Sequence, residues 1–149
     1  MSARTKARKR ALDVLYGADI RQISLSQALA TEAERAANEP QRESSWLYAR
    51  EIVDGVVDNL EEIDEQIETY SQGWTLARMP IVDRAILRIG VWEVVFNDEV
   101  PDGVAISEAV EAATVLSTDD SAGFINGLLA KISQSNTKQN KQHSTGTER

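Results

Sequence analysis

Residues 81–97, IVDRAILRIGVWEVVFN, carry apolar side chains on nearly every side of a helix. Two apolar stripes run along them at helical spacing. One stripe consists of Ile81, Val82, Ala85, Ile86, Ile89 and Trp92, and the other of Leu87, Val91 and Val95. A helix that is apolar almost all round is buried by other helices. We therefore expect residues 81–97 to form the central helix of a helical protein.

Six more helices are predicted around this one, because the three prolines fall between segments of helical periodicity. The expected helices cover about residues 3–21, 24–38, 44–60, 63–72, 81–97, 102–116 and 118–133. Ser24 or Ser26 is the expected N-cap of the second helix. The alternation typical of strands is missing, so the predicted fold class is all-α. We expect residues 1–78 and 79–134 to be two small bundles that share a core.

Length and composition set limits on domain number and chemistry. The 149 residues are typical of one domain, which we place at residues 1–133. Residues 134–149 are polar and are expected to be disordered. The chain has no Cys, and its one His, His143, lies in that tail. This excludes disulfides, thiolate metal sites and a Ser-His-Asp triad. With no run of 18 apolar residues, we expect a soluble, cytoplasmic protein without a metal or cofactor.

The charge is distributed unevenly. The net charge is −8, yet residues 1–10 hold five basic residues and no acidic one. The remainder, with 11 basic and 24 acidic residues, therefore carries −13. The five basic residues are Arg4, Lys6, Arg8, Lys9 and Arg10. Two interpretations remain open at this point, a frayed solubilising end or a phosphate-binding arm on the first helix.

Three further features have a structural and a functional interpretation. The acidic stretch 51–68 is interpreted as a solvated helix face, and catalysis has no support. Gly123 and Gly127 are expected to allow a close helix approach. The three tryptophans and Phe124 could stack on nucleic-acid bases, although Trp92 and Phe124 are expected in the core. Leu116 is expected to point inward from the sixth helix.

Several segments, taken in order and spacing, match a known family. They are Arg8-Lys9-Arg10-Ala11, Val14-Leu15-Tyr16, the run 82–89 with Glu93, Val100-Pro101, the run 104–110, Asp120-Ser121 and the run 124–129. Over about residues 3–133 the chain resembles the bacterial transcription antitermination factor NusB (N-utilization substance B) family. The resemblance implies two crossed helical bundles and no enzymatic activity. It also implies binding to single-stranded boxA RNA of nascent rRNA leader transcripts, with the small-subunit ribosomal protein NusE, in the elongating RNA polymerase complex.

The resemblance also implies site residues. Its RNA-binding candidates are Arg4, Lys6, Arg8, Lys9 and Arg10 in the first helix, and Asp120 and Ser121 at the start of the last. Its candidates for partner contacts are Tyr16, Asp83, Arg84 and Glu108. If residues 1–10 act as an arm, we expect their deletion to abolish RNA binding and to leave the helices intact. Two alternatives stay open, a helical adaptor that recruits a basic partner through the acidic face, and a homodimer.

Overall fold

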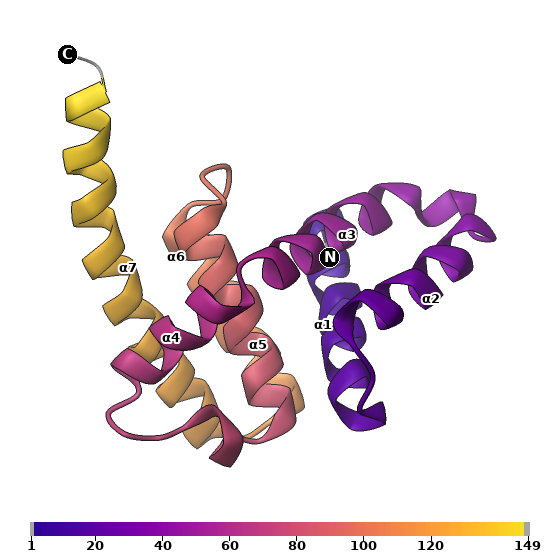
Figure 1. Ribbon diagram of the computed structural model, residues 1–149, viewed down its shortest axis with the longest axis horizontal. Coiled ribbons are helices and arrows are strands. Elements are labelled where there is room, and N and C mark those ends of the chain that lie inside the picture. The colour runs from indigo at the N-terminus through magenta and orange to yellow at the C-terminus, as the bar shows by residue number, and fades with distance from the viewer. Residues whose placement is uncertain (1, 148–149) are drawn as a thin grey trace.

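Seven α-helices follow one another along residues 2–147, which the computed structural model describes, and this part of the chain contains no strand (Figure 1). Side chains are described for these residues except 42, 43 and 137–147, so His143 lies outside the described side chains. The α-helices are α1 (Ala3–Arg21), α2 (Leu25–Ala37), α3 (Glu43–Asp58), α4 (Leu60–Tyr70), α5 (Ile81–Val91), α6 (Asp102–Leu116) and α7 (Asp119–Thr147). Turns of 3₁₀ helix lie at Pro40–Arg42 (η1) and Leu76–Arg78 (η2), and a π-helical turn at Trp92–Phe96 (η3) extends α5. The all-α prediction is confirmed.

Serine hydroxyls cap the N-termini of α1 and α2. The Ser2 Oγ accepts a hydrogen bond of 3.0 Å from the backbone N–H of Thr5. The Ser24 Oγ accepts one of 3.0 Å from the N–H of Gln27. Each bond satisfies a backbone donor that has no partner inside its helix. Of the two predicted caps for α2, Ser24 is therefore the one used.

The helices form two groups that pack across each other (Figure 1). α1, α2 and α3 pack together, and α4, α5, α6 and α7 form the second group. The break falls at Asn59, whose φ of −123° leaves the helical range and whose amide donates to the carbonyl of Gly55 at 2.8 Å. The prediction that residues 1–78 form one bundle is therefore wrong for α4, because its apolar face packs on α5 and α7.

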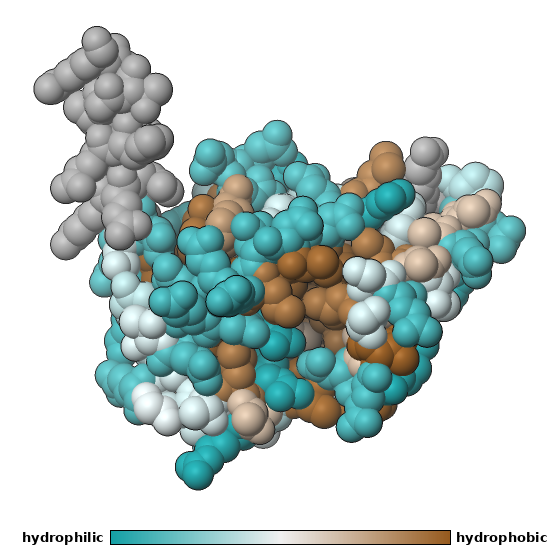
Figure 2. Space-filling view, viewed as in Figure 1, coloured by the Kyte–Doolittle hydropathy of each residue, from teal (hydrophilic) through white to brown (hydrophobic). Residues whose placement is uncertain are grey.

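Helix α5 lies at the centre, as predicted, and contacts α1, α3, α4, α6 and α7. Apolar side chains from all seven α-helices form one continuous core around it. On the face shown in Figure 2, apolar side chains are visible in the middle of the molecule, with hydrophilic ones around them. Leu116 is an exception to the predicted core, because it lies at the end of α6 with 48% of its surface exposed. None of the described helices is long and apolar enough to cross a membrane.

Helix α7 continues beyond residue 133, where the sequence predicted that the folded part ends. The hydroxyls of Ser135 and Tyr70 share a hydrogen bond of 2.7 Å. Asn136 is buried, and its amide donates to the carbonyl of Ile132 at 2.8 Å. The prediction of a disordered tail from Gln134 onward is therefore wrong at its first residues, because polar side chains there find partners on α4 and on the preceding turn.

Close helix approach depends on glycines other than the two predicted. A Cβ atom at Gly55 would lie 1.9 Å from the Nε1 of Trp92, and one at Gly90 would lie 2.8 Å from a leucine side chain of α7. A Cβ at Gly123 or Gly127 would meet nothing within 4 Å. The close contacts thus lie where α3 meets η3 and where α5 meets α7.

Candidate nucleic-acid and partner interface

The five basic residues at the start of α1 fall into two groups. Arg4, Lys6 and Lys9 are exposed, whereas Arg8 and Arg10 are buried. Helical geometry explains the division, because positions 7, 8, 10 and 11 face the other helices while positions 4, 6 and 9 face solvent. The structure therefore leaves three of the five predicted cations at the surface, where Arg4 pairs with the exposed Glu99 at 3.4 Å.

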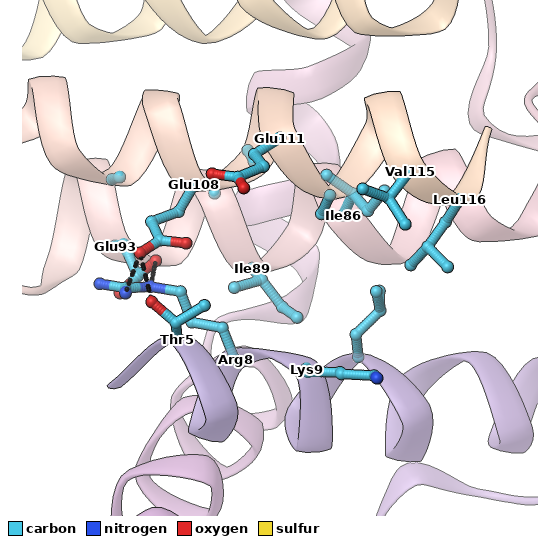
Figure 3. Close-up of a pocket in the computed structure, with 15 residues that line it drawn as sticks. Thr5, Arg8, Lys9, Ile86, Ile89, Glu93, Glu108, Glu111, Val115 and Leu116 are labelled. Atoms are coloured by element: carbon cyan, nitrogen blue, oxygen red, sulfur yellow. Dashed lines mark hydrogen bonds and ion pairs between the residues drawn. The ribbon is translucent and has the colours of Figure 1, made fainter. Parts of the chain in front are cut away.

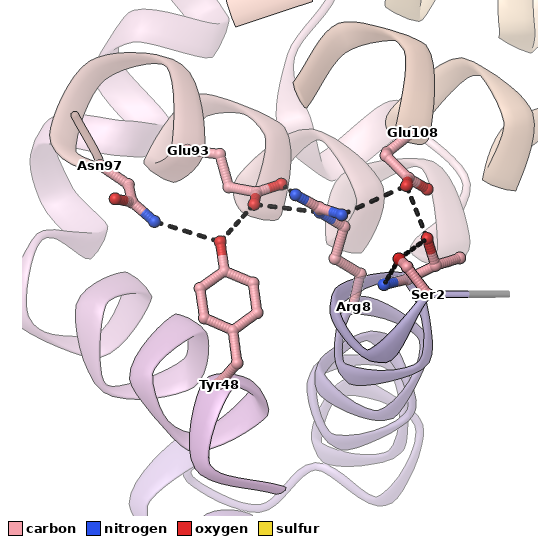
Figure 4. A network of polar contacts seen from close by, with 7 residues as sticks. Ser2, Arg8, Tyr48, Glu93, Asn97 and Glu108 are labelled. Atoms are coloured by element: carbon pink, nitrogen blue, oxygen red, sulfur yellow. Dashed lines mark hydrogen bonds and ion pairs between the residues drawn. The ribbon is translucent and has the colours of Figure 1, made fainter. Parts of the chain in front are cut away.

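Arg8 is held by carboxylates from two distant helices (Figure 4). Its Nε donates to the carboxylate oxygens of Glu93 at 2.8 and 3.0 Å, and its Nη1 lies 3.2 Å from Glu108. The Tyr48 hydroxyl donates a short hydrogen bond to Glu93 and accepts one of 3.1 Å from the Asn97 amide. This buried network joins α1 to α3, α6 and the end of α5.

The burial of this network shifts two pKa values. Burial and the hydrogen bond to Glu93 raise the pKa of Tyr48, so its hydroxyl keeps its proton. Burial acts to lower the pKa of Arg8, but the hydrogen bond and charge of Glu93 outweigh it and raise that pKa. Arg8 is therefore charged and neutralised inside the protein.

Arg10 ties α1 to the second and third helices. Its guanidinium lies 3.3 Å from Glu32 and 3.9 Å from Glu39, and it also lies over the Trp46 ring at 5.4 Å from the centroid. Residues 2–10 are consequently part of the bundle. The expectation that this segment can be deleted without loss of helical structure does not fit these contacts.

The start of α7 is fastened to the start of α5. The Thr118 Oγ1 accepts a hydrogen bond from the Ser121 N–H at 3.0 Å, and the Ser121 hydroxyl donates to Asp83 at 2.7 Å. Asp83 is almost fully buried, whereas Asp120 is exposed. Asp83 thus positions Ser121, and Asp120 places a negative charge at the surface next to it.

Three of the four predicted partner residues are engaged within the chain. Asp83 holds Ser121, Arg84 lies 3.5 Å from Asp19, and Glu108 accepts a hydrogen bond of 2.7 Å from the Thr5 hydroxyl. Tyr16 is exposed.

A groove of about 290 Å³ runs between α1 and α6, with α5 as its floor (Figure 3). Its apolar lining includes Ile86 and Ile89 of α5 and the exposed Val115 and Leu116 of α6. The groove was not predicted from the sequence. The two adjacent apolar residues at the end of α6 were its only signal.

The described side chains include no group of three His, Cys, Asp or Glu residues arranged as metal ligands. The features that remain are a surface with three cations, an apolar groove beside it and a capped helix start. Such features are suited to binding.

Comparison with known proteins identifies the family. The sequence profile of the NusB family matches residues 5–134, which is most of the chain. The chain belongs to the NusB family. A transcription antitermination protein NusB from Leifsonia xyli subsp. xyli is 87% identical over 134 residues, which cover 90% of this chain and 93% of that protein. Its counterpart from Clavibacter sepedonicus is 69% identical over 132 residues, covering 89% and 96%.

Solved structures agree with this membership. T. maritima NusB superimposes with a TM-score of 0.76 at 31% identity, covering 88% of this chain and 90% of that one. A chain from the crystal structure of antitermination factors NusB and NusE in complex with dsRNA gives a TM-score of 0.77 at 29% identity, covering 91% and 98%. The fold of two crossed helical bundles is therefore that of the NusB family.

Proposed function

We propose that this chain is a transcription antitermination factor without catalytic activity, which works in the cytoplasm. In this proposal it binds boxA-type single-stranded RNA of nascent rRNA leader transcripts together with NusE, within the elongating RNA polymerase complex. Family membership and the 87% identity to a named antitermination protein support this function. The structural observation that carries it is the set of exposed cations Arg4, Lys6 and Lys9 in the first turns of α1, of which Lys9 lines the groove between α1 and α6.

The RNA surface in this proposal is smaller than the sequence suggested. Arg8 and Arg10 hold α1 in place, and the three exposed cations meet phosphates. Each phosphate contact to a single strand contributes about −0.7 to the slope of log affinity against log salt, so three contribute about −2. Such a slope goes with modest affinity, and the negative charge of the rest of the chain lowers it further. Because this affinity is modest, we expect that a second protein is needed to complete the RNA-binding surface.

The groove between α1 and α6 is our proposed contact for NusE. Its apolar floor provides surface for burial, and the exposed Val115 and Leu116 extend it at one end. Lys9 and Glu111 line it from opposite helices and offer a charge of each sign. Leu12 of α1 also lines the groove, and the exposed Tyr16 lies one helical turn after it. The buried core of a protein interface is more apolar than the rest of the surface, and tyrosine is among the residues that contribute most to binding.

Fluorescence anisotropy with a short boxA-like RNA and a scrambled control, with and without NusE, tests the proposal. Selective binding that NusE strengthens would support it. Equal binding of both RNAs would reduce the role of α1 to nonspecific phosphate attraction. Tight NusE binding without any RNA affinity would contradict the proposal and favour the adaptor. Sedimentation of the free chain at the same concentrations reports whether a homodimer forms.

Neutralising the exposed cations should weaken RNA binding without unfolding the chain. We expect the triple variant Arg4→Gln, Lys6→Gln, Lys9→Gln to make the salt slope shallower by about 2. Titrations at several salt concentrations measure this slope. Lys131→Gln, at an exposed position of α7, is the control and should leave it unchanged. An unaltered slope in the triple variant would move the RNA site away from α1.

Asp120→Asn should tighten RNA binding. The exposed carboxylate lies in the first turn of α7, where the backbone N–H groups would otherwise favour a phosphate. Removing one such charge changes binding by about 0.3–1 kcal/mol, which is a twofold to fivefold gain in a titration at fixed salt. Asp58→Asn, on the acidic side of the molecule, is the matched control. Unchanged or weaker binding by the Asp120 variant would exclude repulsion by this residue.

A further inference from the structure

One tryptophan differs from the other two in its surroundings. Trp74 has 40% of its surface exposed, whereas Trp46 and Trp92 have 8% and 6%. Trp74 lies in the loop between α4 and η2. Exposed aromatic side chains are the platforms on which proteins stack unpaired bases, and neither the groove nor the α1 cations include Trp74.

The loop holds Trp74 firmly. Gln72 and Gly73 both adopt positive φ values, 59° and 89°, which turn the chain sharply after α4. The Ser71 hydroxyl donates to the Trp74 carbonyl at 2.6 Å, and the carboxylate of Glu68 accepts a hydrogen bond from the backbone beyond it at 3.2 Å. These bonds fix the backbone of the loop around Trp74, and a preformed loop lowers the entropic cost of binding.

Phe124 supports the indole from the side of the core. The two rings meet edge to face, with centroids 5.0 Å apart and planes at 80°. In this arrangement Phe124 covers at most one face of Trp74. Phe124 is itself packed against the core, so the pair joins the loop to the second turn of α7.

The charges around Trp74 favour a ligand that places an uncharged aromatic ring on the indole and keeps its phosphate groups away from the carboxylates of α7. The exposed Arg78 follows four residues after Trp74, and its side chain has no partner among the described residues. Asp119 and Asp120 in the first turn of α7 instead repel a phosphate placed directly on them. A base of a flexible single strand can lie on the indole while its phosphates stay on the side of Arg78.

We propose that Trp74 stacks on one unpaired base of the bound RNA, with Phe124 as its support. The inference rests on the proposed RNA-binding function. Every base has a π face, so stacking on a tryptophan tolerates any base. The contact therefore adds affinity and fixes the path of the strand without selecting the sequence.

Substitution of Trp74 tests the contact. Stacking of one base on an aromatic residue contributes about 1–3 kcal/mol by alanine substitution, so we expect Trp74→Ala to weaken RNA binding about tenfold. The salt slope should not change, because no phosphate contact is lost. Trp74→Phe should keep most of the affinity. Leu47→Ala removes another exposed apolar side chain, on α3, and should have no effect on RNA binding.

Tryptophan fluorescence gives a direct readout, since Trp74 is the exposed tryptophan. Binding of RNA should quench part of the emission of the wild-type chain and none in Trp74→Phe. RNA with abasic sites should bind the wild-type chain about tenfold more weakly and quench less, which tests stacking even if Trp74→Ala does not fold.

The outcomes separate this inference from the function on which it rests. RNA that binds without quenching, and with equal affinity for wild type and Trp74→Ala, overturns the stacking and leaves the function standing. Loss of NusE binding in Trp74→Ala with RNA affinity unchanged overturns it in favour of a protein contact. A wild-type chain that binds no RNA, with or without NusE, overturns both.

Discussion

Replacing Glu93 by alanine should lower the free energy of unfolding by about 3–5 kcal/mol. Glu93 is 1% exposed and receives hydrogen bonds from Arg8 and Tyr48. Without the carboxylate, Arg8 keeps its charge in a buried place with only Glu108 beside it, and the Tyr48 hydroxyl loses its acceptor. A small domain has about 5–15 kcal/mol of stability in total. The loss is therefore a large part of it.

Urea denaturation followed by circular dichroism measures this effect. Glu99→Ala is the matched control, because Glu99 also pairs with an arginine of α1, at 3.4 Å from Arg4, but is 73% exposed. An exposed pair of this kind contributes about 0.2–1 kcal/mol at most. Glu93→Gln, which keeps the shape and removes the charge, should fall between the two. Equal midpoints for Glu93→Ala and Glu99→Ala would show that burial of the network adds nothing.

Gly55→Ala should destabilise the fold by about 3 kcal/mol. A Cβ atom there would lie 1.9 Å from Nε1 and 2.3 Å from Cε2 of Trp92, a buried and rigid ring. The ring has to move or the two bundles have to separate, and overpacking of this kind costs about 1–3 kcal/mol or more. The gain of about 1 kcal/mol in helix propensity from glycine to alanine does not offset it.

Gly127→Ala is the control for Gly55→Ala. Gly127 lies inside α7, and a Cβ there would meet nothing within 4 Å. Gly127→Ala should therefore stabilise the chain by about 0.5–1 kcal/mol. Thermal unfolding of both variants checks the pair of predictions. If Gly55→Ala raised the melting temperature as Gly127→Ala should, the contact between α3 and Trp92 would be looser than the structure shows.

Much of the fold follows from local patterns. Apolar spacing and the prolines located all seven helices, and the apolar surroundings predicted for residues 81–97 placed α5 in the centre. The division between the bundles was misplaced, because periodicity continues through residue 59 and does not show which neighbour α4 packs on. The end of the folded part was also misplaced, because the segment after residue 133 is polar in sequence, yet Asn136 within it is buried.

The site was harder to predict, for a physical reason. The sequence counts cations but does not show which of them meet carboxylates. Arg8 and Lys9 are neighbours with similar charge, yet Arg8 meets Glu93 and Glu108 while Lys9 faces solvent. The two carboxylates that meet Arg8 follow it by 85 residues or more in the sequence. The groove was missed for the same reason, because its walls, α1 and α6, are about 100 residues apart in the sequence and meet only in the folded chain.

The pairing of Arg8 with Glu108 has a consequence for biosynthesis. The ribosome adds about 5–20 residues per second, and 100 residues separate the two partners, so about 5–20 s pass between their syntheses. For most of that interval, until residue 93 has been added, Arg8 lacks both of the carboxylates that neutralise it, and α1 lacks the part of α5 and α6 that covers it. The helix that carries the exposed cations is therefore made before the other described helices, yet it gains its last ion pair only when α6 has been made.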